Sequence, residues 1–349
     1  MFLIDNEDGR LASFKLALQN YFQIASNEKP SRIKTSSSIP AEYFQDLEGL
    51  WNEHDKILSE YHQKYLETSW EEMERPEFSY FDLKIEITER IMECCSLCEK
   101  NCRINRKIEN GFCKVNKPHI SSEFLHMGEE PPLVPSHTIF FSGCNFKCVY
   151  CQNWDISQYP DHGMVLEPEK LAKIIDLRRG QGSKNVNFVG GDPTPNLSYI
   201  LKTMKNSMEN IPVIWNSNMY LSEHAMKLLD GFADLYLTDF KYGNNECAKR
   251  LSGISNYSEV VRRNHKIAYK AGDMIIRHLV LPNHVECCSK PVLDWIQQNL
   301  GNETILNIMG QYRSVYKANE CGEIMRYPSR EEIEETISYA KKLGLKNLI

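Results

Sequence analysis

The chain of 349 residues, 42% of them hydrophobic, is long enough for one large domain or for a main domain with an appendage. Its net charge of −6 and the lack of a basic block argue against nucleic-acid binding, because such proteins hold phosphate groups with Lys and Arg. No run approaches about 18 consecutive apolar residues and no secretory signal is evident, so we expect a cytoplasmic protein without a membrane partner.

Residues 1–90 are predicted to form a polar, helical extension. Apolar residues between Leu47 and Met73 recur at spacings typical of one or two amphipathic helices. The stretch from Ser31 to Pro40 is rich in Ser, Pro and Lys and is expected to be a connector. No pattern here indicates catalysis, so packing or contact with a partner is the expected role.

Residues 91–136 form a cysteine-rich segment. Four cysteines follow one another closely, with Cys94 beside the first of them: Cys95, Cys98, Cys102 and Cys113. Because the chain is long and shows no signal, metal ligation is a better interpretation of its 12 cysteines than disulfides. Four closely spaced thiolates are typical of a closed site that holds structural zinc or an auxiliary [4Fe–4S] cluster. The spacing does not choose between these two, and free buried thiols are the remaining alternative.

Residues 137–349 alternate between predicted strands and predicted helices. The strands are Thr138–Ser142, Asn185–Val189, Val213–Asn216, Leu235–Asp239, Met274–Leu281 and Ile305–Met309. The helices are Glu167–Arg179, Leu197–Met208, Ser222–Leu229, Tyr257–Ala271, Pro291–Leu300 and Arg330–Leu343. This alternation indicates βαβ units and an α/β fold with a parallel sheet, whose strand ends carry the chemistry.

A cysteine triad follows the first of these strands and is the most informative stretch of the chain. Cys144, Cys148 and Cys151 have the spacing C-x3-C-x2-C, and Tyr150 stands directly before the third. Three thiolates on one loop can hold three irons of a [4Fe–4S] cube, which leaves the fourth iron open to a substrate or cofactor. A fourth cysteine would close the cluster and favour an electron carrier.

Polar residues and glycines follow the other predicted strands. The second strand ends in Gly190-Gly191-Asp192, where two glycines allow the backbone to approach a ligand closely, although such a pair alone is more often a turn. The later strand ends contribute Asn216, Ser217 and Asn218, then Asp239 and Lys241, then Arg277, His278 and His284, and finally Gln311, Tyr312 and Arg313.

Together these motifs resemble those of the radical S-adenosylmethionine (SAM) enzymes. From Cys95 to about Leu343 the chain is similar to the branch named as homologues of pyruvate formate-lyase activating enzyme. The resemblance implies a partial, six-stranded (β/α)6 TIM-like barrel and a [4Fe–4S] cluster on the triad, with SAM as its fourth ligand. In such enzymes the reduced cluster cleaves SAM to a 5′-deoxyadenosyl radical, which removes a hydrogen atom from the substrate. The low potential required implies an external electron donor such as flavodoxin or ferredoxin.

The resemblance also assigns roles to the strand ends. Gly190, Gly191 and Asp192 match the Gly-Gly-Glu-Pro element that contacts the SAM amino group, with Asp192 in place of Glu. The other cofactor-binding candidates are Tyr150 for adenine, Asn216, Ser217 and Asp239 for a monovalent cation, Asn218 and Lys241 for the SAM carboxylate or ribose, and Arg277 for SAM. Asn216 stands where the family has a carboxylate, and a solvent-facing ion pair is the alternative for Asp239 and Lys241.

The space beyond SAM is expected to hold the substrate. His278, Gln311, Tyr312 and Arg313 are the candidate substrate contacts, and His284 is a further one, with a structural role as the alternative for either histidine. Cys247, Cys287, Cys288 and Cys321 are scattered and are interpreted as ordinary cysteines, although Cys321 lies in a loop near the predicted site. No catalytic residue beyond the cluster ligands is identified.

The leading hypothesis is a radical SAM oxidoreductase that abstracts hydrogen from a protein or peptide, either to install a glycyl radical or to make another modification. The N-terminal extension would help to dock that partner. Two alternatives remain open: a radical SAM enzyme that acts on a small-molecule metabolite, and an iron–sulfur or zinc protein without catalytic activity.

Overall fold

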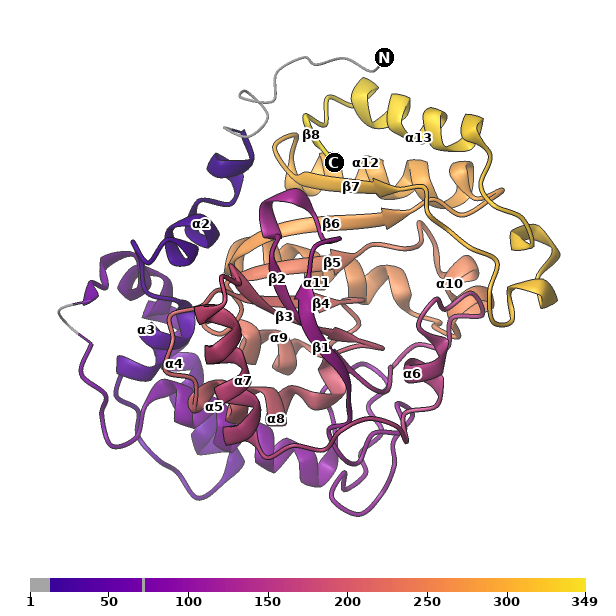
Figure 1. Ribbon diagram of the computed structural model, residues 1–349. Helices are drawn as coiled ribbons and strands as arrows, with labels where there is room; N and C mark the ends of the chain where they lie inside the picture. Colours follow the sequence, from indigo (N-terminus) through magenta and orange to yellow (C-terminus); the bar gives the residue numbers. More distant parts are fainter. Residues whose placement is uncertain (1–12, 71–72) are drawn as a thin grey trace.

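Figure 1 shows the computed structural model of the protein, which describes residues 13–70 and 73–349. Its centre is one eight-stranded sheet in which the strands lie side by side in sequence order. β1 (Ile120–His126) is antiparallel to β2 (Ser136–Phe141), and every later strand is parallel to its neighbour. The later strands are β3 (Asn185–Gly190), β4 (Val213–Ser217), β5 (Leu235–Asp239), β6 (Asp273–Leu279), β7 (Ile305–Met309) and β8 (Asn347–Leu348). This mostly parallel sheet is consistent with a partial barrel.

The predicted count of six strands is wrong, because the sheet has eight. All six predicted strands are present as β2 to β7, whereas the two edge strands were missed. In β1 only Ile120 is buried, and β8 is two residues long. Neither gives the apolar run by which a strand buried on both faces is recognised.

Helices connect the parallel strands, and the six predicted ones are all present. They are α7 (Pro168–Gly180), α8 (Leu197–Lys205), α9 (Glu223–Leu229), α11 (Tyr257–Ala271), α12 (Lys290–Leu300) and α13 (Arg330–Lys342). Two short helices were not predicted: α6 (Trp154–Gln158) and α10 (Asn245–Ser252). α10 is polar, but Asn244 caps its first turn by accepting a hydrogen bond from Cys247 N, and Gly253 ends it with φ +69°. These two caps are the sequence signal that could have identified it.

The N-terminal region is helical, as predicted, over α2 (Gln19–Ala25), α3 (Arg32–Ser38), α4 (Leu47–Glu67) and α5 (Tyr80–Ile91). The interpretation of Ser31–Pro40 as a connector is wrong, since α3 occupies most of it. Its first turn is held by Asp234, which accepts a hydrogen bond from Arg32 N at 2.8 Å, and the Ser36 hydroxyl donates to Gly231 O at 2.6 Å. Contacts with the sheet region therefore override the weak local helix preference of this serine-rich stretch.

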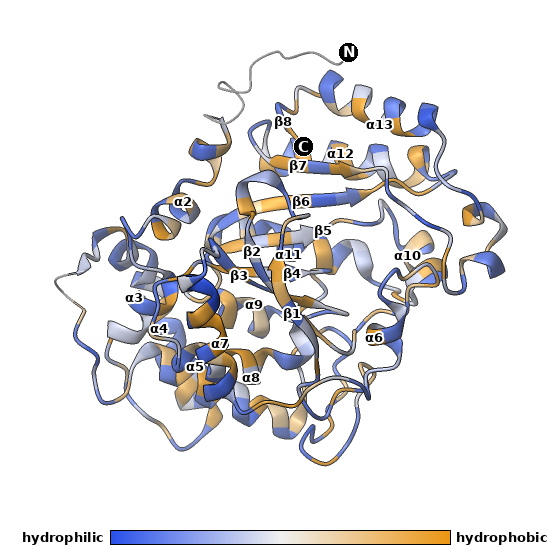
Figure 2. Ribbon diagram, in the orientation of Figure 1, coloured by the Kyte–Doolittle hydropathy of each residue, from blue (hydrophilic) through white to orange (hydrophobic). Residues whose placement is uncertain are grey.

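Hydrophobic packing joins the N-terminal helices to the sheet. Tyr61, Tyr80 and Phe81 belong to one large core cluster with residues of β2 to β7 and the surrounding helices. A second cluster combines Phe14, Leu18 and Tyr21 with side chains of β4 to β7. In Figure 2 hydrophobic residues run along the central strands, whereas α13 is mostly hydrophilic. Within the described residues, no helix combines the length and apolar character needed to cross a membrane.

Candidate functional site

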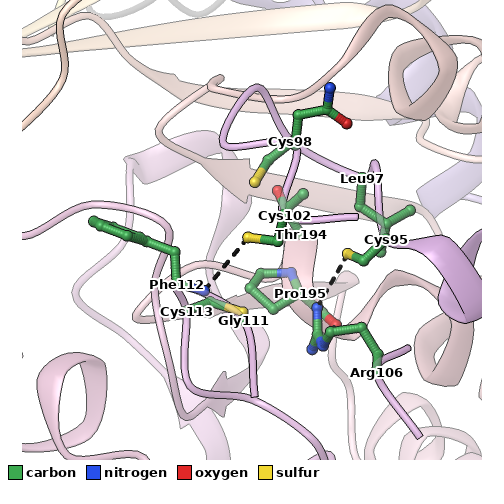
Figure 3. Close-up of a pocket in the computed structure, with 11 residues that line it drawn as sticks. Cys95, Leu97, Cys98, Cys102, Arg106, Gly111, Phe112, Cys113, Thr194 and Pro195 are labelled. Carbon is green, nitrogen blue, oxygen red and sulfur yellow. Dashed lines mark hydrogen bonds between the residues drawn. The ribbon is translucent and has the colours of Figure 1, made fainter. Parts of the chain in front are cut away.

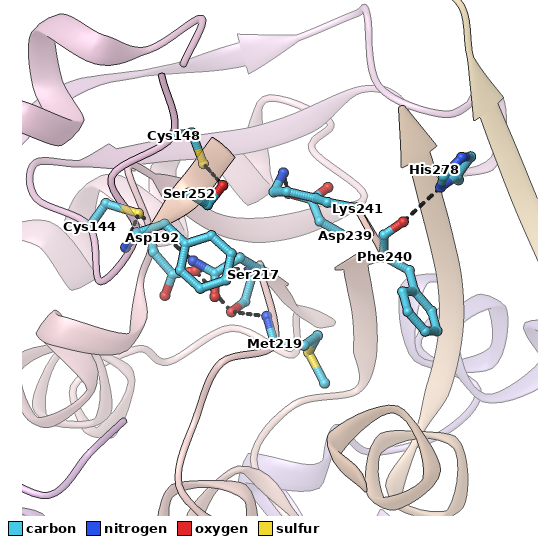
Figure 4. Close-up of polar contacts among 12 residues, drawn as sticks. Cys144, Cys148, Asp192, Ser217, Met219, Asp239, Phe240, Lys241, Ser252 and His278 are labelled. Atoms are coloured by element: carbon cyan, nitrogen blue, oxygen red, sulfur yellow. Dashed lines mark hydrogen bonds and ion pairs between the residues drawn. The ribbon is translucent and has the colours of Figure 1, made fainter. Parts of the chain in front are cut away.

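The cysteine triad lies on the loop that leaves β2, and all three thiols line one cavity of about 260 Å³. The same cavity is lined by residues from the carboxyl ends of β3, β4, β5, β6 and β7. Figure 4 shows Cys144 and Cys148 on the same side of the sheet as Asp192, Ser217 and Lys241, which lie at or just after the ends of these strands. Among the cavity-lining residues of the described chain there is no fourth cysteine. The predicted open coordination position therefore faces a space bounded by polar groups.

Each thiol of the triad has a nearby hydrogen-bond partner. Phe146 N donates to Cys144 Sγ at 3.3 Å, Ser252 Oγ lies 2.9 Å from Cys148 Sγ, and Ser157 Oγ lies 3.1 Å from Cys151 Sγ. Burial raises the pKa of Cys144 and of Cys148, so iron binding has to displace their protons. Donors of this kind stabilise the thiolate form that a metal requires.

The spacing of the sulfur atoms fits a cluster better than a single ion. Two thiolates on one tetrahedral zinc ion stand about 3.8 Å apart, because each Zn–S bond is about 2.3 Å long. In the described part of the chain, only one group of three or more potential ligands has all its ligand atoms within 4.8 Å of one another, and it lies elsewhere. The triad sulfurs are therefore more widely spread, as expected when each binds its own iron of a [4Fe–4S] cluster.

Three glycines allow the triad loop and the loop after β3 to pack closely against neighbouring segments. A Cβ atom at Gly143, where φ is +91°, would lie 2.0 Å from Val115 Cγ2. A Cβ atom at Gly190, where φ is +129°, would lie 1.9 Å from Phe141 O, and one at Gly191 would lie 2.2 Å from Gly143 O. Gly190 and Gly191 line the cavity, but the close approach that demands glycine is to neighbouring backbone.

Asp192 ties two strand-end loops together. Its Oδ1 accepts a hydrogen bond from Thr194 N at 3.0 Å, and its Oδ2 accepts from Ser217 Oγ and Asn218 N, both at 3.0 Å. The carboxylate is almost completely buried, and burial raises its pKa. Its oxygens are thus engaged within the protein, which makes Asp192 a positioning residue for the loop after β4.

Asn218 faces the triad. Its Nδ2 donates to Asn145 Oδ1 at 2.7 Å and lies 3.8 Å from Cys144 Sγ, while its Oδ1 accepts from Tyr220 N at 3.0 Å. Asn216 and Ser217 line the cavity beside it. Of these three side chains, only that of Asn218 contacts the triad loop directly, whereas the Ser217 hydroxyl donates to Asp192 Oδ2.

Asp239 and Lys241 form an ion pair of 2.7 Å inside the cavity. Burial would lower the pKa of Lys241, but Asp239 and the nearby Cys148 outweigh it and raise that pKa above its usual value. The two side chains are 25% and 20% exposed, so the alternative of a solvent-facing pair does not fit. The cavity thus contains the positively charged ammonium group of Lys241 near the thiol of Cys148.

Arg277 lies on β6 and lines the cavity, but it already has two carboxylate partners that the sequence did not reveal. Its Nε and Nη2 donate to the two oxygens of Glu130, both at 2.7 Å, and Nη2 also donates to Glu129. Asn307 Nδ2 donates to Glu130 at 2.8 Å. Burial would raise the pKa of Glu130, yet Arg277 outweighs it and keeps that pKa low. The only local feature of the sequence that could have pointed to these partners is the pair of glutamates directly before Pro131.

The residues predicted to contact substrate are not brought together. Gln311 lines the cavity, whereas Tyr312 is buried and donates its hydroxyl to Ile324 O at 2.7 Å, and Arg313 is exposed. His278 lies outside the residues that line the cavity, with Nδ1 donating to Phe240 O at 2.8 Å and Nε2 at 2.8 Å from Ser289 Oγ. Burial lowers the pKa of His278 to about 4. The substrate role predicted for His278 therefore does not fit, and the structural alternative does.

A chain of hydroxyl groups, also missed in the sequence, runs from the cavity to the triad. Tyr150 lines the cavity, and its Oη lies 2.6 Å from Tyr242 Oη, which lies 2.6 Å from Ser252 Oγ. Ser252 Oγ contacts Cys148 Sγ. If the sulfur is a thiolate it can only accept, so Ser252 donates to it, Tyr242 donates to Ser252, and Tyr150 donates to Tyr242.

The four-cysteine segment gathers its thiols around a smaller pocket, drawn in Figure 3. Arg106 Nη1 lies 3.6 Å from Cys95 Sγ, and Phe112 N donates to Cys102 Sγ at 3.4 Å. Burial raises the pKa of Cys98 to about 12. Cys94 is exposed and does not line this pocket. The structure thus brings Cys95, Cys98, Cys102 and Cys113 to one place, as their spacing indicates.

The four-cysteine segment docks directly on the triad region. Arg106 Nη2 donates to Pro195 O at 3.2 Å, and Ser222 N donates to Leu97 O at 3.1 Å. The position of a Cβ at Gly143 is only 3.0 Å from Cys113 O. The segment therefore supports the loops after β2, β3 and β4, which carry the triad and its neighbours.

Comparison with known proteins agrees with this geometry. A family model described as the Radical SAM superfamily matches residues 138–296, which include the triad and the ends of β2 to β6. An uncharacterised protein of Methanocaldococcus jannaschii is 47% identical over 338 residues, covering 95% of this chain and 98% of that protein. The chain belongs to the radical SAM superfamily. Membership in the radical SAM superfamily implies an enzyme that uses a [4Fe–4S] cluster and SAM.

More distant similarities add less. A second uncharacterised protein of the same organism is 24% identical over 274 residues, covering 70% of this chain and 79% of that protein. A crystal structure of Streptococcus suis SuiB bound to precursor peptide SuiA superposes with a TM-score of 0.47 and 12% identity, covering 85% of this chain and 62% of SuiB. This radical SAM chain therefore spans less than two thirds of SuiB.

Proposed function

We propose that this radical SAM protein cleaves SAM at a [4Fe–4S] cluster held by Cys144, Cys148 and Cys151, and abstracts hydrogen from a protein or peptide. The observation that carries the proposal is the triad cavity: three thiols open onto a space of about 260 Å³ that is lined by polar strand ends. When bound, the reduced cluster supplies one electron that splits SAM and starts hydrogen abstraction.

Residues of the cavity have distinct proposed tasks. Lys241 and Asn218 are proposed to bind the SAM carboxylate or ribose, and Asn216, Ser217 and Asp239 to hold a monovalent cation. Tyr150 presents its ring to the adenine while its hydroxyl is held by Tyr242. Gly190 and Gly191 form part of the cavity wall, and Arg277, paired with its two glutamates, is proposed to contact SAM.

Exposed aromatic rings near the triad favour a peptide substrate over a small metabolite. Trp154 on α6 is 39% exposed and stacks on Tyr316, with ring centroids 5.6 Å apart, and Tyr159 contacts Trp154 edge-on. The neighbouring Asn153 and Gln152 line the cavity. Aromatic side chains of this kind are enriched where proteins bind other chains, because they bury large areas at low entropic cost. A flavodoxin or ferredoxin is the proposed electron donor.

The four-cysteine segment is proposed to hold an auxiliary [4Fe–4S] cluster. No three of its sulfur atoms lie within 4.8 Å of one another, since the only such group of ligands in the described residues lies elsewhere. A single zinc ion would need sulfurs about 3.8 Å apart. The wider spread favours a cluster, in which every thiolate binds a different iron.

The proposal is tested by SAM cleavage. Anaerobically reconstituted, reduced protein is expected to convert SAM to 5′-deoxyadenosine, and Cys144→Ala is expected to lose this activity because one iron ligand is missing. Cys94→Ala is the matched control, since Cys94 is exposed and outside both cysteine groups. If Cys144→Ala forms 5′-deoxyadenosine as fast as the parent protein, the proposal fails.

The substrate class needs a separate measurement. Protein and low-molecular-weight fractions from deuterated cells are each incubated with the enzyme and unlabelled SAM, and deuterium in 5′-deoxyadenosine is quantified. Transfer from the protein fraction supports the proposal. Transfer only from the small-molecule fraction would replace it with the metabolite alternative.

A further inference from the structure

Two cysteines that the sequence left without a role meet His284, which was a candidate substrate contact. Cys247 lies on α10, and His284 and Cys287 belong to the connection between β6 and α12. The Sγ atoms of Cys247 and Cys287 and a ring nitrogen of His284 all lie within 4.8 Å of one another. Cys247 and Cys287, which are far apart in the sequence, are therefore brought together in the structure.

The geometry matches a tetrahedral ion. Cys247 Sγ and Cys287 Sγ are 3.9 Å apart, close to the separation of about 3.8 Å expected for two thiolates on one zinc ion. Cys287 lies in a π-helical turn, η5 (Val285–Ser289), a rare conformation that is often found at functional sites. Asn244 Nδ2 donates to Cys287 O at 2.7 Å and so fixes the turn against the start of α10.

The orientation of His284 leaves the correct nitrogen available. Its Nδ1 lies 2.7 Å from Pro282 O, and because a carbonyl oxygen can only accept, Nδ1 carries the proton. Nε2 then carries the ring's lone pair, and Arg250 Nη2 lies 3.4 Å from it. A ring nitrogen held by a backbone carbonyl in this way is the usual arrangement of metal-binding histidines.

The charges around the group are also suited to a divalent cation. Arg250 Nη2 lies 3.4 Å from His284 Nε2 and 3.8 Å from Cys247 Sγ, which marks this point as one that attracts positive charge. Arg250 is paired with Glu323 at 2.6 Å, so these two side chains cancel each other. Two thiolates would then be neutralised by one divalent ion.

We propose that Cys247, His284 and Cys287 bind one zinc ion. Sulfur and imidazole ligands in tetrahedral geometry favour zinc among the common divalent metals. Glu323 Oε1 lies 3.9 Å from His284 Nε2 and is the nearby carboxylate that we assign as the candidate fourth ligand.

The zinc ion would clamp the helix that supports the triad. Leu251 O and Ser252 O, at the end of α10, accept hydrogen bonds from Val149 N at 2.9 Å and Lys147 N at 3.1 Å, and the Ser252 hydroxyl contacts Cys148 Sγ. A metal that joins Cys247 to the turn after β6 holds α10 at its other end. The site is thus a structural support for the cluster loop and is independent of SAM cleavage.

Protection from alkylation tests the zinc site in the unmodified, full-length protein. Cys287 and Cys94 are both exposed thiols, but only Cys287 belongs to the proposed site. With the iron sites reconstituted under nitrogen, added Zn²⁺ is expected to slow N-ethylmaleimide labelling of Cys287 by about tenfold or more, because a metal-bound thiolate is a poor nucleophile. Labelling of Cys94, quantified by mass spectrometry in the same sample, is expected to stay unchanged. Equal labelling of Cys287 with and without Zn²⁺ would overturn the proposal.

Metal content gives an independent test. The parent protein, loaded with Zn²⁺ and desalted, is expected to retain one more zinc ion per chain than Cys247→Ser, with the same iron content. Cys321→Ser, which alters a cysteine outside the group, is expected to retain the parent amount. Equal zinc in the parent and Cys247→Ser would reject the site, whatever the outcome of the SAM assay.

Discussion

The cysteine triad and the four-cysteine segment hold their thiols in different surroundings. The triad lines a cavity of about 260 Å³ together with Lys241, Asp239 and Asn216, whereas the four thiols of the cysteine-rich segment line a much smaller pocket with Arg106, Leu97 and Phe112 among its other residues. The triad offers three ligands and an open space, and the segment offers four ligands with no comparable space. The number of cysteines thus agrees with what surrounds them: three thiols beside an open cavity in one case, and four thiols around a small pocket, proposed to be a closed metal site, in the other.

The two groups are nevertheless one structural unit. Gly143 directly precedes Cys144, and its Cα faces Val115 and Cys113 O so closely that no side chain fits. The four-cysteine segment therefore packs directly against the loop that carries the triad. Because the two cysteine groups are in contact, a substitution at one group can be tested by measuring the iron content of the other.

The largest effect is expected from Gly143→Ala. The new Cβ would lie 2.0 Å from Val115 Cγ2 and would need φ near +91°, so overpacking and backbone strain together are expected to cost about 2–4 kcal/mol. We expect iron binding to fall at both cysteine groups, measured as iron and sulfide per chain. Gly180→Ala is the control, because nothing lies within 4 Å of its Cβ position.

A double variant separates the contact from the strain. Val115→Ala removes the methyl group that the new Cβ would strike, so Gly143→Ala/Val115→Ala is expected to recover part of the iron content. Full iron content in Gly143→Ala alone would show that the two cysteine groups are not mechanically joined.

Cys98→Ala sharpens the contrast between closed and open sites. If the four-cysteine segment holds an auxiliary cluster, this variant is expected to lose about four irons per chain while the triad keeps its own. Loss of zinc without loss of iron would instead identify a structural zinc site. Metal analysis of Cys98→Ala beside Cys94→Ala, whose altered cysteine is exposed, decides between the two.

A smaller effect concerns the helix that leads into the closed site. Lys84 on α5 is fully buried, with Nζ 2.7 Å from Asp230 O and 3.1 Å from His54 Nε2, and burial lowers its pKa to about 7. The unfolded chain binds this proton up to a pH of about 10.4, so the unfolding free energy is expected to rise between about pH 7 and pH 10 and to level off below pH 7, where both states bind the proton.

The control for this pH dependence is a pair of variants on neighbouring helices. Lys84→Met is expected to flatten the rise in the denaturant midpoint between pH 7 and pH 10, while Lys64→Met, at an exposed position of α4, is expected to leave it unchanged. An unchanged rise in Lys84→Met would mean that other groups cause it.

The sequence was sufficient for the elements whose signal is local. Each of β2 to β7 contains buried apolar residues because both faces of a parallel sheet are covered, and helices such as α8 show buried residues at Leu197, Ile200, Leu201 and Met204. Prediction from the sequence failed for elements that depend on contacts with residues far away in the chain. α3 depends on Asp234, 202 positions away, and β1 is a half-buried edge.

The same distinction applies to the site. The triad was predicted from a spacing of seven residues, and the strand-end groups from the parallel arrangement of the strands. The hydrogen-bond partners of those groups could not be predicted, because they are far away in the sequence. Glu130 is 147 positions from Arg277, and Ser252 is 104 positions from Cys148. The Cys247 group is equally non-local, with 40 positions between its two cysteines. Spacing identifies ligands on one loop, but only folding shows which distant residues tune them.

The smallest predicted effect tests that tuning. Ser252→Ala removes the hydroxyl that lies 2.9 Å from Cys148 Sγ and ends the chain from Tyr150 and Tyr242. A hydrogen bond to a cluster ligand stabilises the more negative, reduced state, so its loss is expected to make the reduction potential of the triad cluster more negative. A hydrogen bond worth about 1 kcal/mol corresponds to about 40 mV for one electron.

Comparison with two further serines shows whether the shift comes from this contact. Ser157→Ala removes the equivalent hydroxyl at Cys151, 3.1 Å from Sγ, and is expected to change the potential in the same direction. Ser198→Ala removes a hydroxyl that donates to Glu89 and is expected to leave the potential unchanged. A redox titration followed by electron paramagnetic resonance measures all three. If Ser252→Ala shifts the potential no more than Ser198→Ala, the hydroxyl chain supports the fold of α10 but does not tune the cluster, and the open site depends on its cavity alone.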